Sequence, residues 1–380
     1  MKRGRATNRL LDFYLGIPVL NLLASFRRRG IRPQNPETIG LLFNPAMGDT
    51  LLASAATQDV RTIYPDAKII LFAAKTNIAA ARLLPAVDAI EMLPISRPIE
   101  ALRVLRRHKL DLMLDFTSWQ RITAFYTMIS GAKFTVGFER KQQFRHRGYD
   151  KTVPHRGDCH EVDNLRRLTQ SLGAEFRSEP RLLIPVSPVS RPASKMEKAV
   201  VFHAWATGTL SLLREWPDES WVELAQRLSV PGRVFLLTGS PADEPRCLEL
   251  CEKLARSGVP AEVVIGRDGL AGVAQLLQQA EMLVSVNTGI MHLGAILGVP
   301  TVALNGPNSA HRWGPVGPRV ANVRTSDGSG GFLDLGFEFQ GRNAMVNISV
   351  EDVMLAIGQL DQSHVAAGMT IDSYDLDSSS

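Results

Sequence analysis

Short apolar runs that alternate with longer amphipathic segments constrain the fold of this sequence more than any other feature. In its first half the expected strands are Ile39–Asn44, Lys68–Phe72, Ala89–Leu93, Leu110–Asp115 and Phe134–Val136. Helical patterns follow at Asp49–Ile63, Trp119–Ile129 and His160–Leu172. Alternation of this kind is typical of a parallel sheet with helices on both faces.

The same alternation begins again after a stretch rich in Pro and Ser. That stretch, SEPRLLIPVSPVSRPASKMEK, has no periodicity and is typical of a linker between domains. The strands expected beyond it are Ala199–Phe202, Val234–Leu237, Glu262–Ile265, Met282–Ser285 and Thr301–Leu304, with a last helix at Val350–Leu360. We therefore predict an α/β fold of two doubly wound, Rossmann-like domains that face each other across a cleft. Such sheets bind ligands at the carboxyl ends of their strands.

A length of 380 residues suits two domains. The predicted segments are an arm (1–36), a first domain (37–180), a linker (181–198), a second domain (199–362) and a tail (363–380). The tail ends in IDSYDLDSSS, a composition that we interpret as solvated disorder.

Positive charge gathers in the arm. The net charge is +5, but before Pro33 the arm carries a single acid, Asp12, against Lys2, Arg3, Arg5, Arg9, Arg27, Arg28, Arg29 and Arg32. This uneven placement argues against a nucleic-acid groove in the body of the protein. The apolar run Leu10–Phe26 is short for a membrane span and lacks a small-residue cleavage site. It predicts either amphipathic turns on the anionic inner face of a bacterial inner membrane or a helix packed on the protein itself.

Three cysteines indicate a reducing compartment. Cys159, Cys247 and Cys251 form neither an even disulfide framework nor a CxxC pair. We interpret them as structural thiols and expect a cytoplasmic protein.

An ordered set of motifs resembles glycosyltransferase family 9, the ADP-heptose:lipopolysaccharide heptosyltransferases and their relatives. In chain order the motifs are AMGDTLLASA, LDLMLDF, HEVDNLRRL, LREWPDESWVELAQRL, VFLLTGSPAD, NTGIMHLGAILGVPTVALNGP and RWGP. Each motif alone is weak, whereas their order and spacing over about 39–360 are specific.

The resemblance implies a GT-B fold whose first domain binds the acceptor and whose second binds a nucleotide-sugar. It also implies inverting transfer to a cell-envelope glycan or glycolipid precursor, with neither a metal nor a cofactor. The nucleotide-sugar is a co-substrate, for which ADP-heptose is the candidate.

The donor site is expected where Asn287, Thr288 and Gly289 open a helix after a strand. The free N–H groups and dipole of a helix start favour a diphosphate. His292 lies in the first turn, and Arg214 stands where the family carries a basic residue before its Trp-Pro. The alternative is an ordinary Asn cap on a buried helix. We expect Asn287 both to cap the helix and to contact the hydroxyls of the donor.

Asp49 is the predicted general base, because it follows the first strand at the place where the resemblance puts that role. The alternative is an Asp that caps a helix. Gln120 and Arg121, with Asp115, follow the Leu110–Asp115 strand and are candidates for the acceptor pocket.

Two departures from the family pattern keep other functions open. Asn287 stands where the family usually has Asp, and Ala204-Trp205-Ala206 where it usually has Pro-Gly. They leave room for a catalytically silent partner that binds sugar nucleotides, and a nucleotide-sugar epimerase of related fold is a further alternative. The Asp375 and Asp377 pair matches a metal-binding DxD, but it lies in the tail without a strand before it.

Overall fold

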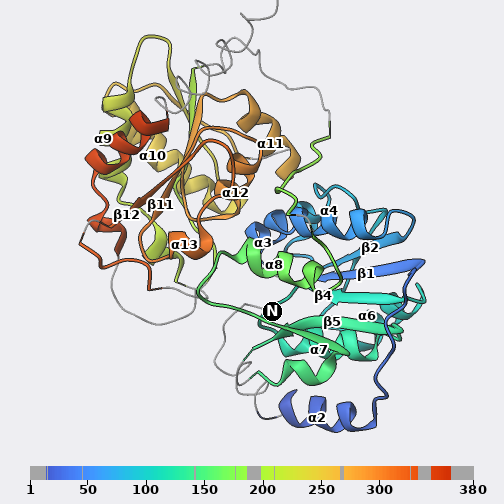
Figure 1. Cartoon of the computed structure of the whole chain (residues 1–380). Helices are drawn as coiled ribbons and strands as arrows, with labels where there is room; N and C mark the ends of the chain where they lie inside the picture. The colour runs from blue at the N-terminus through green and yellow to red at the C-terminus, as the bar shows by residue number, and fades with distance from the viewer. Residues whose placement is uncertain are drawn as a thin grey trace, which may run out of the picture. The chain divides into compact units, whose positions relative to one another are not determined.

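The computed structural model describes residues 14, 16–44, 46–140, 143–175, 177–185, 198–208, 210–265, 269–325, 327–332 and 344–360. The chain divides into two compact units, Met1–Pro185 and Val186–Ser380, and each contains a six-stranded sheet (Figure 1). The predicted tail beyond 362 and the linker residues 186–197 lie outside the described ranges.

All neighbouring strands of the N-terminal sheet run parallel. Their order is β3 (Ala89–Met92), β2 (Lys68–Ala73), β1 (Thr38–Phe43), β4 (Leu112–Asp115), β5 (Phe134–Glu139) and β6 (Lys151–Pro154). Strand β6 was not predicted from the sequence. It is a four-residue edge strand with a single buried side chain, Val153, so it carries no apolar run.

Helices cover both faces of this sheet (Figure 1). On one face lie α3 (Met47–Leu52), α4 (Ser54–Ile63) and α8 (Glu161–Gln170), and on the other lie α6 (Pro98–Arg106) and α7 (Arg121–Ile129), while α5 (Ile78–Ala81) is one short turn. The prediction of a single helix over Asp49–Ile63 is wrong, because the helical segment begins at Met47 and is divided at Ala53 into α3 and α4. Leu42, Phe72 and Met113 of the sheet form a buried cluster with Leu105 and Tyr126 of the second face.

The C-terminal sheet is also parallel throughout. Its order is β12 (Val320–Arg324), β11 (Thr301–Asn305), β10 (Met282–Val286), β7 (Ala199–His203), β8 (Val234–Leu237) and β9 (Ala261–Val263). Its longer helices are α9 (Asp218–Leu228), α10 (Glu244–Arg256), α11 (Gly269–Gln279), α12 (Gly289–Ile296) and 350–360. The predicted class, two doubly wound parallel sheets, is confirmed.

Strand order reverses once in each sheet, between β1 and β4 and between β7 and β10. In doubly wound sheets, ligands bind at the carboxyl ends of the strands that flank such a reversal. Asp49 follows β1, Gln120 and Arg121 follow β4, Arg214 follows β7, and Asn287 follows β10. Every predicted site residue therefore follows one of the four strands beside a reversal.

The arm contributes helix α2 (Ile17–Phe26), which is fastened to the N-terminal unit. Leu20 is 1% exposed. Just past the helix, Arg27 forms an ion pair of 2.6 Å with Asp150 and donates to the carbonyl of Gly148. Asp150 also accepts from the backbone N–H groups of Gly30 and Thr135. This carboxylate is the clip that holds the end of the arm.

Replacing Asp150 with Asn tests the clip. The side chain of Asp150 is 1% exposed, and an amide nitrogen in place of an oxygen would face donors only. We expect a loss of about 1–3 kcal/mol in the free energy of unfolding, measured with urea. Asp158→Asn is the matched control, because the Asp158–Arg156 pair is exposed and should contribute little to stability. Equal losses in the two variants would contradict the clip.

Candidate functional site

The turn after β10 begins α12, as the sequence predicts, but the cap differs. Thr288 is the N-cap residue, with extended backbone, and the helix starts at Gly289. The expectation that Asn287 caps the helix is therefore wrong. Gly294 lets α12 approach β10 closely, since a Cβ there would come within 2.5 Å of Leu283 Cδ2. The later part of α12 thus packs directly on β10.

Asn287 instead belongs to a chain of amides that joins three strands. Its Nδ2 donates to Asn305 Oδ1 (2.6 Å) and to the carbonyl oxygen of Trp313 (3.0 Å). Asn305 Nδ2 donates in turn to Asn322 Oδ1 (2.8 Å). These residues connect β10, β11 and β12 with the short helix α13 (Ala310–Trp313). Both partners of Asn287 Nδ2 are oxygens, so position 287 needs a donor, which a carboxylate does not provide.

Thr288 and His292 place further polar groups at the start of α12. Thr288 Oγ1 is buried and makes no cap bond, and within the described ranges it has no hydrogen-bond partner. His292 is 4% exposed on the same helix. A hydroxyl beside the first N–H groups of a helix suits an oxyanion ligand.

Arg214 ends the 3-10 helix η4 (Ser211–Arg214), which follows β7. Its Nη2 donates to the carbonyl oxygen of Thr207 at 2.5 Å. Nε is buried and finds no acceptor in the described part of the chain. Burial lowers the pKa of Arg214, and the charge of the neighbouring Glu215 opposes that shift. A guanidinium with a buried, unsatisfied donor favours an anion as its missing partner.

His203 ends β7 but supplies no positive charge. It is buried, and its Nδ1 lies 3.1 Å from Thr238 Oγ1. Burial lowers the pKa of His203 to about 4, so the ring is neutral at physiological pH. Positive charge beside this strand comes from Arg214.

In the N-terminal unit, Asp49 is the third residue of α3 and its cap is Ala46. The alternative prediction, that Asp49 is the N-cap residue of this helix, is therefore wrong. Its Oδ2 accepts from the N–H of Ala46 at 3.2 Å, which fixes the carboxylate at the helix start. Asp49 remains partly exposed, as a proton acceptor for a bound hydroxyl must be.

Gln120 joins the ends of β1 and β4, because its Oε1 accepts from Asn44 Nδ2. Arg121 is 6% exposed, and its Nε donates to the carbonyl oxygen of Gln143 at 2.7 Å. Asp49 and Gln120 therefore follow the carboxyl ends of the neighbouring parallel strands β1 and β4. Arg121 is the next residue after Gln120.

Asp115, by contrast, is structural. It is fully buried and accepts from Tyr149 Oη (2.6 Å) and Arg145 Nη2 (2.8 Å). Burial raises the pKa of Tyr149 well above its usual range, so the phenol stays protonated. Sequence reasoning missed Arg145, because it lies in the charged run FRHRG yet is fully buried. Two of its nitrogens, Nε and Nη1, are buried without an acceptor among the described residues.

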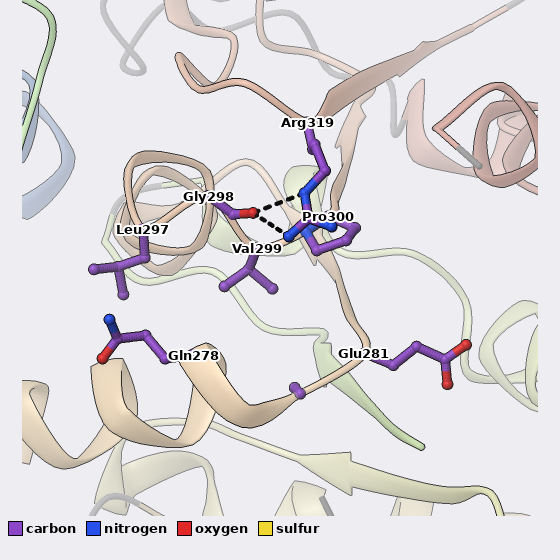
Figure 2. A pocket seen from close by; sticks show the side chains of 8 residues that line it. Gln278, Glu281, Leu297, Gly298, Val299, Pro300 and Arg319 are labelled. Atoms are coloured by element: carbon purple, nitrogen blue, oxygen red, sulfur yellow. Dashed lines mark hydrogen bonds between the residues drawn. The ribbon is translucent and has the colours of Figure 1, made fainter. Parts of the chain in front are cut away.

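A cavity of about 350 Å³ lies elsewhere in the C-terminal unit (Figure 2). Glu281, Pro300 and Arg319 line it, and each of them comes just before a strand, so the cavity lies at the amino ends of β10, β11 and β12. Arg319 donates to the carbonyl oxygen of Gly298 from Nε (3.0 Å) and Nη2 (2.7 Å). This end of the sheet is opposite the Asn287 turn and is not the candidate site.

The described residues contain neither a cluster suited to a metal ion nor a membrane-spanning helix. No group of three or more His, Cys, Asp or Glu side chains is arranged to hold a metal ion there. None of the helices in those ranges has the length and apolar character needed to cross a bilayer. Asp375 and Asp377 lie beyond the last described residue.

Two parallel sheets of one strand order, with polar side chains at each reversal, define a two-unit α/β protein of the Rossmann-like class. Residues 100–330 match glycosyltransferase family 9 (heptosyltransferase), and the chain belongs to that family. The resemblance drawn from the motifs is confirmed.

Individual proteins that are similar to this chain are also family 9 glycosyltransferases or heptosyltransferases. Lipopolysaccharide heptosyltransferase 1 of Pseudomonas aeruginosa is 28% identical over 204 residues, which cover 52% of this chain and 55% of that protein. The chain thus aligns with about half the length of this curated relative. Among solved structures, the family 9 glycosyltransferase from Veillonella parvula matches with a TM-score of 0.72 and 19% identity, covering 88% of this chain and 99% of that one. Heptosyltransferase WaaC of E. coli with ADP matches at 0.65 and 21%, covering 85% and 99%.

Replacing Asn287 with Asp tests the amide chain. A carboxylate between Asn305 Oδ1 and the Trp313 carbonyl would lose two hydrogen bonds, and we expect about 1–3 kcal/mol of destabilisation at neutral pH. These acceptors favour the protonated acid, so the new carboxyl should have a folded-state pKa above its unfolded value. Its protonation therefore restores stability as pH falls through the folded pKa, and the deficit grows again as pH rises.

Asn287→Ala is the control, because it removes the same donors without adding a titratable group. Thermal unfolding at neutral and mildly acidic pH should show a pH-dependent deficit for Asn287→Asp and a constant one for Asn287→Ala. An aspartate variant as stable as the parent at neutral pH would show that position 287 needs no donor.

Proposed function

We propose that this protein is an inverting, metal-independent heptosyltransferase that moves a heptose from ADP-heptose to a cell-envelope glycolipid or glycan precursor. Family membership supports the reaction class. E. coli WaaC, a structure of similar fold, has been solved with ADP and with ADP-2-deoxy-2-fluoro heptose, which supports the donor. The observation that carries the proposal is the pairing of two groups suited to a diphosphate, at the carboxyl ends of β7 and β10.

The first of these groups is the start of α12, with its free N–H groups and the unsatisfied Thr288 hydroxyl. The second is Arg214, whose buried Nε lacks an acceptor in the described part of the chain. A diphosphate would satisfy both, and the helix dipole would add to the attraction. His292, in the first turn of α12, would then lie beside the donor.

Asp49 is the proposed base. The acceptor hydroxyl gives its proton to the Asp49 carboxylate while its oxygen attacks the anomeric carbon of the donor. The bond from that carbon to the departing phosphate oxygen breaks, and ADP leaves with the electron pair. Attack from the face opposite the diphosphate inverts the anomeric configuration. Arg214 and α12 stabilise the charge that develops on the diphosphate.

The acceptor is proposed to lie over the carboxyl ends of β1 and β4. Gln120 and Arg121 follow β4, and Asn44 ties Gln120 to the end of β1.

The departures from the family pattern do not favour a silent partner. Asn287 is required as a hydrogen-bond donor between Asn305 and Trp313. Trp205 is 3% exposed in the core of the C-terminal unit, with the guanidinium of Arg246 5.6 Å from its ring centre. Both residues have structural roles that leave the donor groups in place. An epimerase would release or convert nucleotide-sugar without an acceptor, so acceptor-dependent ADP release separates the two activities.

The proposed transfer reaction takes place in the bacterial cytoplasm, at the inner face of the inner membrane. The three cysteines are free in the structure, Cys247 and Cys251 included. A reducing compartment suits such thiols. The acceptor, a precursor of the envelope, would be met at the membrane surface.

Asp49→Asn tests the base. The amide oxygen can still accept from Ala46, so the fold and donor affinity should survive. Turnover, measured as acceptor-dependent ADP release, should fall by about 10²–10⁴. Asp66→Asn, a change to an exposed carboxylate of the same unit, should leave turnover unchanged. Full activity in Asp49→Asn would remove Asp49 from the mechanism.

A chelator and Arg214→Ala together test how the diphosphate charge is met. EDTA should leave ADP release intact. Arg214→Ala should weaken ADP binding in calorimetry, and more so at low salt, where an unscreened charge counts most. The exposed Arg256→Ala is the control for a general loss of positive charge. A strict requirement for an added divalent cation would contradict the proposal and make Asp375 and Asp377 candidates for metal ligands.

A further inference from the structure

Helix α2 carries its apolar stripe on the outside. Val19, Leu22, Leu23 and Phe26 follow the i, i+3, i+4, i+7 spacing of one helix face and are 44%, 61%, 37% and 80% exposed. The buried residue, Leu20, lies beside this stripe, on the side of the helix that packs on the unit. A surface helix ordinarily turns such a stripe toward the core, so this one is arranged for a partner outside the unit.

Positive charge borders the stripe. Arg28 and Arg29 follow Phe26 directly and are exposed, whereas Arg27 is engaged by Asp150. The sequence has no Asp or Glu between Asp12 and Glu37. An apolar stripe beside uncompensated arginines complements a surface that is apolar beneath and anionic above.

The stripe is held in place. Asp150 receives Arg27 and the N–H of Gly30, and Arg32 donates to the hydroxyl of Tyr64. The body of α2 packs against α7 and against the 3-10 helix η2 (Arg145–Gly148). Figure 1 shows α2 beside α7, at the edge of the N-terminal unit. The apolar face is therefore presented as a ridge on an already folded helix, so binding does not require the helix to form.

We propose that this ridge docks on an anionic phospholipid surface. Leu22, Leu23 and Phe26 enter the boundary between headgroups and acyl chains, while Arg28 and Arg29 meet the lipid phosphates. A second copy of the chain is a poorer occupant, because a symmetric contact would bring the same arginines together. Through the contact of α2 with α7, docking holds the proposed acceptor-binding unit at the membrane. That last step rests on the proposed function, whereas the lipid contact does not.

Vesicle sedimentation tests the ridge without any enzyme assay. The full-length protein should bind vesicles of equimolar phosphatidylcholine and phosphatidylglycerol, and bind pure phosphatidylcholine much less. The double change Leu22→Ser with Phe26→Ser should lower the partition coefficient about tenfold or more. Arg28→Gln with Arg29→Gln should lower it about tenfold at low salt, with little effect at high salt.

Ile99→Ser and Arg82→Gln are the controls, since each changes an exposed residue of the same unit far in sequence from α2. Both should bind vesicles like the parent protein. The proposal is overturned if the parent ignores anionic vesicles, or if the α2 variants bind them normally. It is equally overturned if those variants only turn a dimer into a monomer in the absence of lipid. ADP binding should be unchanged in every α2 variant, so a failure here is distinct from a failure of the donor site.

Discussion

The reversal of strand order beside β1 and β7 is the constraint on which the rest of the structure depends. Because the connections leave in opposite directions on either side of a reversal, the carboxyl ends of the two flanking strands are left uncovered. Asp49 and Gln120 occupy those ends in one unit, and Arg214 and Thr288 occupy them in the other. The chain thus repeats one winding pattern in both units, and places different polar side chains at the carboxyl ends of the central strands in each.

Much of this could be predicted from the sequence, because the central strands are buried on both faces. Leu41 and Leu71, like Val201 and Val284, are fully buried and belong to continuous apolar runs. Edge strands β6 and β12 were missed because their sequences, KTVP and VANVR, place polar residues between the apolar ones and so form no continuous apolar run. Helix starts were misplaced by one or two residues at Asp49 and Asn287, since a cap is decided by backbone angles that the residue type only favours.

The partners of polar side chains were beyond the sequence. Nothing in the spacing of Asp115, Arg145 and Tyr149 shows that they meet in the core, so a candidate for the acceptor pocket proved to be a buried ion-pair residue. The same holds for α2, where the apolar pattern was clear but its direction was not. The burial of Leu20 and the ion pair between Arg27 and Asp150 show which side of the helix faces the protein.

The amide chain from Asn287 to Asn322 has a consequence for how this family can vary. Asn287 and Asn305 share one hydrogen bond, and each uses its remaining groups elsewhere. An acid at 287 would therefore require residue 305 to turn a donor toward it and the Trp313 carbonyl to move away. Substitutions at the two positions are therefore energetically coupled. Exchanging one of them alone leaves buried hydrogen-bonding groups without partners. We expect relatives with Asn and with Asp at this turn to form separate lineages, each with its own residue at the end of the neighbouring strand.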